Sequence, residues 1–423
     1  MIKTHKFYYK LSWLFLAIGL PLPFVILLKT GLPLIFQDDF LKIAFGLVGY
    51  VWMLAVVYIS TKPKWLDNLI GLSEAYMIHG MLAVFALLAL YVHKFMIPSV
   101  GLIKTVGDVA IYIYTTVIAY SLIMMAGWLT NRVSLLMKIK RFIEKLFKHE
   151  INVWLHRANV VATIGGYVHV CLIDYVRNTM VFALLTVYFA FVMISYAVYV
   201  IRRKGCVTGK VVEVKPLGSK INQLVVEIPE GQLKRYRAGD FVFISFSKKG
   251  LEEPHPFSLE NDPLCEKHLV FAIEEVGDFT RLIEDLKEGD AIYLSCGYGL
   301  LNRIFSEQRN DSVVVITGGM GVVPLIGLME RFKEKECFFL HTVSEGKDML
   351  YEHRFNEWEQ RYTFTSFRQK GRFSHQQLKE CVPIGRDYCY ILAGPMKMNL
   401  SYKKYLISRG VGSEQIYYES FNF

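Results

Sequence analysis

The sequence lacks any cysteine pattern typical of disulfide cross-links or of a metal site. The chain has 423 residues and seven cysteines, an odd number, and no two of them form a CxxC pair. This argues against a disulfide framework and against a cysteine-based metal site. It also favours a reducing compartment for the second half of the chain, where most of the cysteines lie. Internal repeats and low-complexity segments are absent as well, so repeat arrays are not expected.

A cleavable secretion signal is also missing. The first apolar run follows Lys3, Lys6 and Lys10, but no small-residue cleavage site closes that run. We therefore expect the run to be retained as a first membrane span. The net charge is +10, and neither a nucleic-acid partner nor an obligatory protein partner is expected.

Long apolar runs are abundant in the first half of the chain. Hydrophobic residues make up 53% of the sequence and concentrate there, whereas the second half has the composition of an ordinary α/β protein. A helix needs about 20 apolar residues to cross a lipid bilayer. The runs predict six spans, at 11–28, 40–60, 73–93, 107–130, 151–173 and 180–201, with Pro21 and Pro23 as a kink in the first.

The positive charges between these spans alternate from loop to loop. They gather at the N-terminus, in the second loop, in the fourth loop and after the sixth span, where Arg202 and Arg203 stand. Loops rich in Lys and Arg stay in the cytoplasm. We therefore expect a multi-pass protein of the plasma membrane with both termini and the second half of the chain in the cytoplasm. The fourth loop, 135–150, reads either as an amphipathic helix on the inner leaflet or as a solvated connector.

Four histidines stand inside apolar runs. His79 and His93 are fourteen residues apart in the third predicted span, and His156 and His169 are thirteen apart in the fifth. Ionisable residues inside a membrane are costly, and imidazole is a common ligand of haem iron. If the two helices run the same way, His79 faces His156 at one depth and His93 faces His169 at the other. Each pair is placed to bind one haem.

The helical period places His79 and His93 on nearly the same face of their helix, but it does not do so for His156 and His169. Thirteen or fourteen residues separate the two depths by roughly 20 Å. On a straight helix His93 lies about 40° from the face of His79, but His169 lies about 140° from that of His156. We expect a bend or bulge at Gly165-Gly166 between them. Arg132 and Arg157 are candidate partners for haem propionates. The alternative is four unrelated histidines that hydrogen-bond between helices.

Short alternating strands begin near residue 205 and predict a small antiparallel barrel. Two motifs lie among them. The first consists of His255, Pro256, Phe257 and Ser258. The second, with Gly277, Phe279, Thr280 and Arg281, opens an expected helix from Thr280 to about residue 290. There Thr280 would be the N-cap, and the helix N-terminus with Arg281 suits a pyrophosphate.

A parallel α/β pattern follows the barrel. The buried strand 312–317 leads directly into a glycine-rich turn and then a helix, an arrangement that lets backbone amides approach a phosphate. The turn contains Gly318, Gly319, Gly321 and Pro324, so it departs from the GxGxxG form. Ala393, Gly394 and Pro395 follow a later strand, at the carboxyl edge where such sheets bind ligands. The chain ends on Phe423, an aromatic placed to plug a core or cover a flat ring.

These motifs, in this order, resemble the ferric reductase / NADPH oxidase superfamily in its compact bacterial form. The resemblance implies a six-helix transmembrane domain with two b-type haems at 1–203, a ferredoxin-reductase-like FAD-binding barrel at 204–307 and an NAD(P)H-binding α/β domain at 308–423. It identifies the four histidines as haem ligands, His255 to Ser258 as the flavin motif and Gly277 to Thr280 as the flavin-phosphate turn. Phe423 would lie against the flavin ring and swing aside for the nicotinamide. Ala393 departs from the family, which usually has cysteine there.

The activity implied is electron transfer from cytoplasmic NADPH through FAD and two haems to an acceptor outside, O2 giving superoxide. NADPH is favoured over NADH because no acidic residue directly ends the second α/β strand, and Arg372 is a candidate for the 2′-phosphate. A ferric-chelate reductase has the same electron path, and a quinone or a partner protein is a further acceptor class. A transporter with a regulatory nucleotide-binding domain is the alternative from another class, and it predicts no haem.

Overall fold

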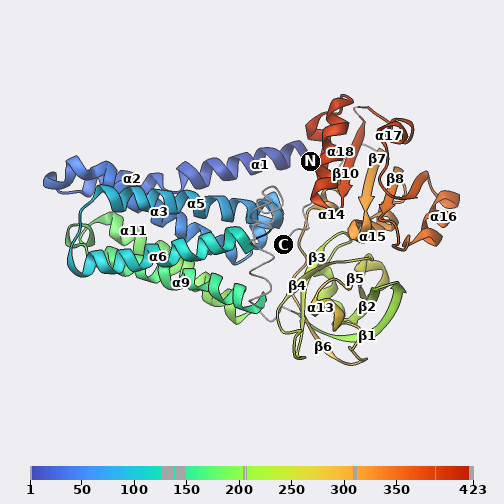
Figure 1. Ribbon diagram of the computed structural model, residues 1–423, viewed down its shortest axis with the longest axis horizontal. Coiled ribbons are helices and arrows are strands. Elements are labelled where there is room, and N and C mark those ends of the chain that lie inside the picture. The colour runs from blue at the N-terminus through green and yellow to red at the C-terminus, as the bar shows by residue number, and fades with distance from the viewer. Residues whose placement is uncertain are drawn as a thin grey trace. The chain divides into compact units, whose positions relative to one another are not determined.

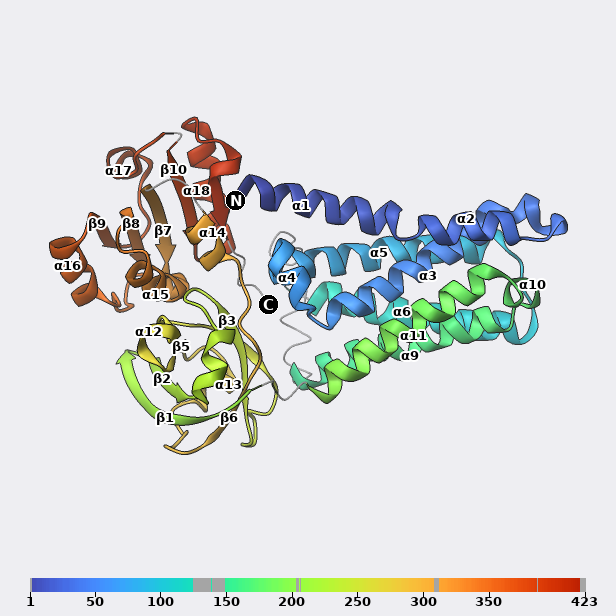
Figure 2. The same ribbon diagram turned by 180° about the vertical axis from the view of Figure 1, so that it is seen from behind.

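The chain forms two compact units. The computed structural model describes residues 2–124, 138, 149–202, 205, 207–307, 312–385 and 387–418. One unit is a helical bundle formed by most of the first half of the chain. The other contains the chain from Ile201 onward, together with the first described residues through Phe7 and the segment Asp67–Ser73. Figures 1 and 2 show helices throughout the first and two β-sheets with covering helices in the second.

Long helices make up the first unit. An N-terminal segment is interrupted by a π-helical turn at Phe15–Gly19, just before Pro21, where the sequence predicted a kink. The helices of the first half of the chain are α1 (Ile2–Leu14), α2 (Leu22–Gly31), α3 (Phe40–Ser60), α4 (Lys64–Ile70), α5 (Leu72–Met96), α6 (Gly101–Met124), α9 (His149–Cys171), α10 (Asp174–Arg177) and α11 (Met180–Ile201), and the start of α1 and the end of α4 belong to the other unit.

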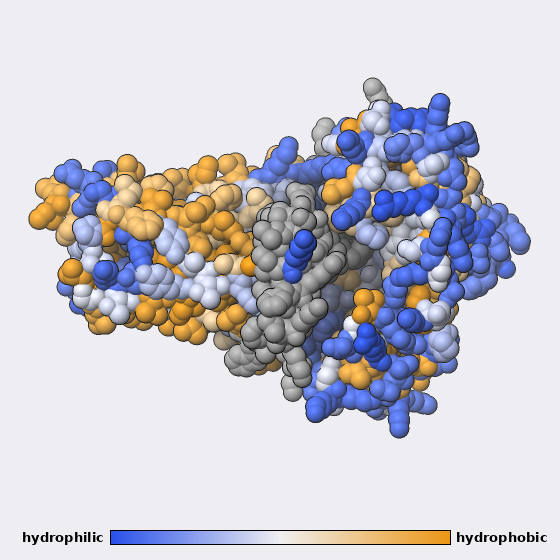
Figure 3. All heavy atoms as spheres, in the orientation of Figure 1, coloured by the Kyte–Doolittle hydropathy of each residue, from blue (hydrophilic) through white to orange (hydrophobic). Residues whose placement is uncertain are grey.

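Five helical segments of the described chain are long and apolar enough to cross a membrane. They are His5–Gly31, Leu34–Ser60, Leu72–Met96, Gly101–Met124 and Met180–Ile201, which overlap five of the six expected spans. The remaining span, 151–173, coincides with α9, which has 23 residues. It carries Arg157, Asn159 and two histidines, and it is not among the five candidate spans. Figure 3 shows hydrophobic residues gathered over the helical unit. The crossing itself and its orientation stay predictions.

A closed antiparallel barrel opens the second unit, as the sequence predicted. Its strand order is β4-β3-β6-β1-β2-β5, and the bridge between Leu259 and Phe271 joins the two edges. The strands are β1 (Val207–Gly218), β2 (Ile221–Glu227), β3 (Phe241–Phe246), β4 (His255–Ser258), β5 (Leu269–Glu274) and β6 (Ala291–Leu294). The first motif is therefore itself a strand, β4, paired with β3. Alternate inward side chains such as Leu224, Ile244 and Phe271 fill the barrel.

The prediction of a helix from Thr280 to about residue 290 is wrong in its length and in its first residue. The structure has only one helical turn, α13 (Asp278–Arg281), with Gly277 as its N-cap. Thr280 acts from inside the turn, because its Oγ1 accepts hydrogen bonds from the backbone N–H groups of Val276 and Gly277, both at 2.9 Å. Ile283 and Leu286 then turn into the barrel core, which ends the helix.

A five-stranded parallel sheet follows, in the order β11-β10-β7-β8-β9. Its strands are β7 (Ser312–Gly318), β8 (Glu336–Val343), β9 (Phe364–Lys370), β10 (Tyr388–Ala393) and β11 (Ile416–Tyr418). In chain order this is a doubly wound sheet, whose direction of winding reverses between β7 and β10. The covering helices are α14 (Leu301–Glu307), α15 (Val323–Arg331), α16 (Glu352–Arg361), α17 (His375–Cys381) and α18 (Met396–Ser408), and α12 (Pro263–Glu266) lies in the barrel.

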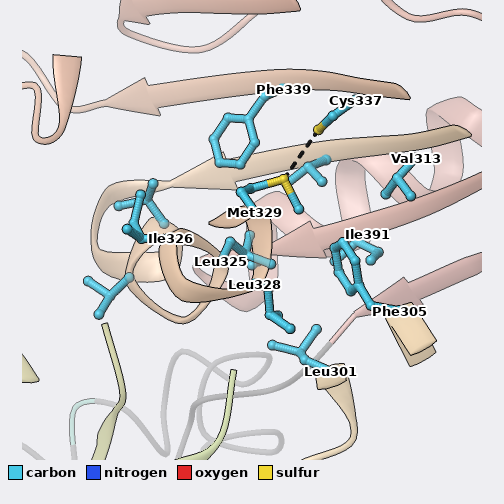
Figure 4. Packing of buried hydrophobic residues seen from close by; sticks show 14 of the residues in the cluster. Leu301, Phe305, Val313, Leu325, Ile326, Leu328, Met329, Cys337, Phe339 and Ile391 are labelled. Atoms are coloured by element: carbon cyan, nitrogen blue, oxygen red, sulfur yellow. Dashed lines mark hydrogen bonds between the residues drawn. The ribbon is translucent and has the colours of Figure 1, made fainter. Parts of the chain in front are cut away.

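Helix α15 packs against the sheet and against the barrel. Its apolar side chains, among them Leu325 and Met329, lie on β7, β8 and β10, and the Sγ of Cys337 is 3.4 Å from the Sδ of Met329 (Figure 4). A Cβ at Gly327 would lie 2.4 Å from the carbonyl carbon of Asn261 in the barrel. Glycine is therefore required where α15 meets the barrel, and this contact fixes the two sheets against each other.

Candidate functional site

The two predicted histidine pairs come together in the bundle. The ring centres of His79 on α5 and His156 on α9 are 5.9 Å apart, and the ring planes are inclined at 50°. Those of His93 and His169 are 6.4 Å apart, at 87°. One pair joins the N-terminal part of α5 to the N-terminal part of α9, and the other joins their C-terminal parts. The two helices therefore run in the same direction. All four rings are half-buried.

The spacing within each pair fits a single metal ion. A histidine nitrogen binds a metal at about 2 Å, so an ion between two imidazoles holds their ring centres roughly 6 Å apart. No group of three or more His, Cys, Asp or Glu side chains that could hold a metal occurs among the described residues. A site with two protein ligands suits haem iron, because the porphyrin supplies the other four ligands. The donors present therefore fit two haems.

Hydrogen bonds at the Nδ1 atoms settle which nitrogen of three rings is free. Nδ1 of His79 donates to the carbonyl oxygen of Val56 at 3.0 Å, and Nδ1 of His93 to that of Lys42 at 2.9 Å. Nδ1 of His169 donates to the carbonyl oxygen of Ile103 at 2.9 Å. A carbonyl can only accept, so each of these Nδ1 atoms carries the proton. Nε2 is then left with its lone pair, as metal ligation requires.

The fourth ring has a different partner. Nδ1 of His156 lies 2.9 Å from the Oγ of Ser121 on α6. A hydroxyl can donate or accept, so this contact alone does not fix the tautomer. Ser121 and the three carbonyls were missed in the sequence. A serine in an apolar helix is a weak signal, and a main-chain acceptor has no signal at all.

Helix α9 is continuous through Gly165 and Gly166, so no interruption of the helix marks the expected bend. The two glycines instead serve packing. A Cβ at Gly166 would lie 2.6 Å from the Tyr50 ring, and one at Gly165 would make ordinary contact with Ala110. The thirteen-residue spacing therefore occurs within one uninterrupted helix, and His156 and His169 still each lie beside a histidine of α5.

A buried polar cluster lies midway along α9 between its two histidines. The hydroxyl of Tyr50 donates to the carbonyl oxygen of Thr163 at 2.8 Å, and that of Tyr114 donates to the Oγ1 of Thr163, also at 2.8 Å. These bonds satisfy the polar groups of three buried side chains and tie α3 and α6 to α9. Arg157, the propionate candidate, directly follows His156, and Arg132 lies outside the described residues.

The two barrel motifs meet around one aromatic ring. The imidazole of His255 on β4 stacks on the ring of Phe279 in α13, with centres 4.1 Å apart and planes inclined at 28°. Phe257 lies on the same ring at 5.9 Å. Arg281 is exposed, and its guanidinium is 3.9 Å from the Asp278 carboxylate. Strand β4 and the Gly277 turn, which are some twenty residues apart in sequence, therefore form one surface. Pro256 and Ser258 lie on β4 itself.

The glycine-rich turn lies at the switch point of the parallel sheet. Gly318 ends β7, Gly319 takes a positive φ of 54°, and Pro324 stands in the first turn of α15. A Cβ at Gly321 would lie 2.1 Å from the carbonyl oxygen of Ala393. The turn after β7 and the Ala393-Gly394-Pro395 turn after β10 are therefore in direct contact. Ligands of doubly wound sheets bind between two such turns.

Arg372 is well placed beside the same edge. Gly371, with φ of 82°, donates its N–H to the carbonyl oxygen of Val343 at 2.8 Å, so Arg372 follows directly beside the end of β8. Arg372 is exposed and has no ion-pair partner within the described chain. Arg368 differs, because its guanidinium contacts Asn356 at 2.8 Å and Glu359 at 3.5 Å.

A buried histidine near this edge is uncharged. His341 on β8 is fully buried, and its Nδ1 lies 2.8 Å from the Oγ1 of Thr317. Burial lowers the pKa of His341 to about 4, so the ring is neutral at physiological pH. His341 therefore carries no positive charge at this edge of the sheet, whereas Arg372 is an exposed guanidinium beside it. The terminal Phe423 lies outside the described residues.

No protein-family model matches the chain. It is similar to the probable dihydroorotate dehydrogenase B (NAD(+)) electron transfer subunit of Methanocaldococcus jannaschii, with 26% identity over 193 residues, 43% of this chain and 69% of the relative. A flavohemoprotein of Halalkalibacterium halodurans is 21% identical over 45% of this chain and 53% of its own length. Among solved structures, the Amycolatopsis cytochrome P450 reductase GcoB covers 51% of this chain and 69% of its own, with 23% identity and a TM-score of 0.43.

The sequence relatives cover less than half of the chain. The chain spans about half the length of several of them, for example 46% of the corresponding Methanopyrus kandleri subunit, which is 31% identical over 131 residues. The barrel, the doubly wound sheet and the sequence relatives together make the C-terminal half similar to ferredoxin-reductase-like modules.

Changing Gly321 to Ala tests the contact between the two turns. We expect the added Cβ to push the glycine-rich turn away from Ala393 and to lower the free energy of unfolding by about 1–3 kcal/mol. The measurement is denaturant unfolding of the purified protein. The control is Gly231→Ala, because a Cβ at Gly231 meets nothing within 4 Å. Equal stability of the two variants would contradict this account of the switch point.

Proposed function

We propose that the protein is a transmembrane electron-transfer oxidoreductase. It takes electrons from cytoplasmic NADPH through FAD and two haems and delivers them to O2 outside the membrane, which gives superoxide. The observation that carries the proposal is the geometry of two histidine pairs, each spaced for one metal ion, in the same chain as a ferredoxin-reductase-like module. The balanced reaction converts one NADPH and two O2 into NADP⁺, one proton and two superoxide ions.

Each part of the chain has a defined task in this proposal. The turns after β7 and β10 hold the nicotinamide dinucleotide, Arg372 binds its 2′-phosphate, and β4 with the Gly277 turn holds the flavin. His79 and His156 form the inner metal site, and His93 and His169 the outer one. When bound, the flavin turns a two-electron donor into single-electron steps, and the haems carry single electrons. The protein supplies position, burial and axial ligation.

The acceptor would react without binding iron. Each histidine pair would supply two ligands and a porphyrin the other four, so no coordination position would be left for the acceptor. His93 and His169 would hold the outer haem, and that haem would supply the electron to an acceptor that binds no iron. The same arrangement would serve a ferric chelate, so the acceptor must be decided by experiment.

Oxygen reduction is tested with purified protein in detergent, supplied with FAD and NADPH in air. We expect cytochrome c reduction that superoxide dismutase abolishes while NADPH consumption continues. Reduction of a ferric chelate without a dismutase-sensitive signal would keep the electron path and replace the acceptor. Protein that purifies without haem would defeat the transmembrane path and favour a transporter with a nucleotide-binding domain.

Removing one ligand of each pair tests the haem assignment. We expect His79→Leu and His93→Leu each to lose about one haem per chain, measured as the pyridine haemochrome against protein. Flavin reduction by NADPH should stay close to wild type, because the reductase-like module is untouched. His353→Leu, which alters an exposed histidine of α16, is the control. Full haem content in both ligand variants would contradict the assignment.

Arg372→Ala tests the nucleotide preference. A charge-assisted hydrogen bond contributes about 1.5–3 kcal/mol, so we expect the KM for NADPH to rise roughly tenfold or more. The KM for NADH should change little, since NADH lacks the 2′-phosphate. Arg368→Ala is the matched control, because carboxylate and amide groups already hold that guanidinium. Equal changes for the two nucleotides would remove Arg372 from this role.

A further inference from the structure

We propose that Gly46 and Gly107 are positioning residues for the outer histidine pair. Each glycine lets one imidazole lie directly on the backbone of a neighbouring helix, where the ring binds a main-chain carbonyl and presents Nε2 to the metal. The inference rests on the haem ligation proposed above. It adds two residues that would act only through the rings of His93 and His169, not by binding iron themselves.

The first observation is the space that each glycine leaves. A Cβ at Gly46 on α3 would lie 2.7 Å from both Cγ and Nδ1 of His93. A Cβ at Gly107 on α6 would lie 2.8 Å from Nδ1 and 3.0 Å from Cε1 of His169. Contacts under 3.0 Å are essentially never made by real Cβ atoms. Any residue larger than glycine would therefore move the ring.

The second observation is the position of the carbonyl acceptors. His93 donates to the carbonyl of Lys42, four residues before Gly46, and His169 to that of Ile103, four residues before Gly107. In an α-helix that carbonyl is the partner of the glycine N–H. Its oxygen has a second lone pair, which the imidazole reaches only because no Cβ covers it.

The same arrangement thus occurs twice, on two different helices and for both members of one pair. It does not occur in the inner pair. Among the described glycines that are not adjacent in sequence to His79 or His156, none would place a Cβ within 4 Å of either ring as one of its three nearest contacts. His79 binds the carbonyl of Val56, with Ser60 four residues later, and His156 uses the Ser121 side chain. The glycine device is specific to the outer site.

Close packing of helices is the competing explanation, and the chain offers controls for it. Gly49 lies on the same helix as Gly46, and its Cβ would come within 2.9 Å of Leu90 Cγ and 3.0 Å of the Ala86 carbonyl oxygen, without touching a histidine. Gly80 directly follows His79, and apart from its chain neighbours it has nothing within 4 Å of an added Cβ. Gly49→Ala reports crowding alone, and Gly80→Ala reports helix composition alone.

The experiment compares Gly46→Ala and Gly107→Ala with these two controls. Haem per protein is measured by pyridine haemochrome, and the two ferric low-spin signals and midpoint potentials by electron paramagnetic resonance and redox titration. We expect Gly46→Ala and Gly107→Ala to lose about one haem per chain, or to shift the signal and potential of one haem only. That haem should be the one missing in His93→Leu. NADPH reduction of the flavin should be unchanged, as should both haem signals in the controls.

A double variant decides cases in which a single variant folds poorly. In His93→Ala the ring is absent, so adding Gly46→Ala should change neither expression nor the remaining haem. If Gly46→Ala is as harmful there as in the wild type, the ring is not what it meets and the proposal is wrong. It is also wrong if both glycine variants keep two unaltered haem signals, or if Gly49→Ala alters the outer signal equally. Wild-type protein without haem would instead overturn the proposed function.

Discussion

An imidazole inside an apolar bundle needs a partner for each of its two nitrogens, and this requirement organises the helical unit. In three of the four rings one partner is a helix carbonyl, which fixes the proton on Nδ1. Nε2 then keeps a lone pair that needs a hydrogen-bond donor or a cation, and the ring centre of the opposing histidine lies 5.9 Å away in one pair and 6.4 Å away in the other. Two neutral imidazoles at this spacing satisfy each other poorly, whereas an ion between them satisfies both.

The carbonyl partners also determine which helices must be neighbours. On α3 the acceptors Lys42 and Val56 are fourteen residues apart, the same interval that separates His93 from His79 on α5. The two helices are antiparallel, and the acceptors on α3 have the same spacing as the histidines on α5. Both histidines of α5 therefore reach a main-chain carbonyl of α3. On α6 the interval from Ile103 to Ser121 is eighteen residues, against thirteen on α9. These two intervals differ. His169 reaches a main-chain carbonyl of α6, whereas His156 contacts the side chain of Ser121.

Much of this organisation follows from sequence, because it depends on period and composition. The apolar run at 40–60 coincides with α3, and the alternating strands form the barrel and the parallel sheet as expected. Contacts to main-chain atoms do not follow, since every residue carries a carbonyl and nothing marks the one that is used. The role of Thr280 was misjudged for a similar reason: the hydroxyl reaches back to two N–H groups from the third position of the turn.

Glycine serves the same physical purpose in both units, where a backbone must be approached closely. At the switch point, Gly321 lets one turn rest on the carbonyl of Ala393, and at the outer pair Gly46 lets a ring rest on α3. Neither glycine has a positive φ, so neither is explained by backbone conformation, and only the contact accounts for it. Close to the outer pair, Lys94 pairs with Asp108 at 2.9 Å and joins α5 to α6 one residue beyond His93 and Gly107. The ion pair and the two glycine contacts therefore constrain the same helix ends, and the outer pair is held mainly by main-chain atoms. A site held in this way is intolerant of an added Cβ, whereas the inner site has one main-chain contact, at Val56, and one side-chain contact, at Ser121.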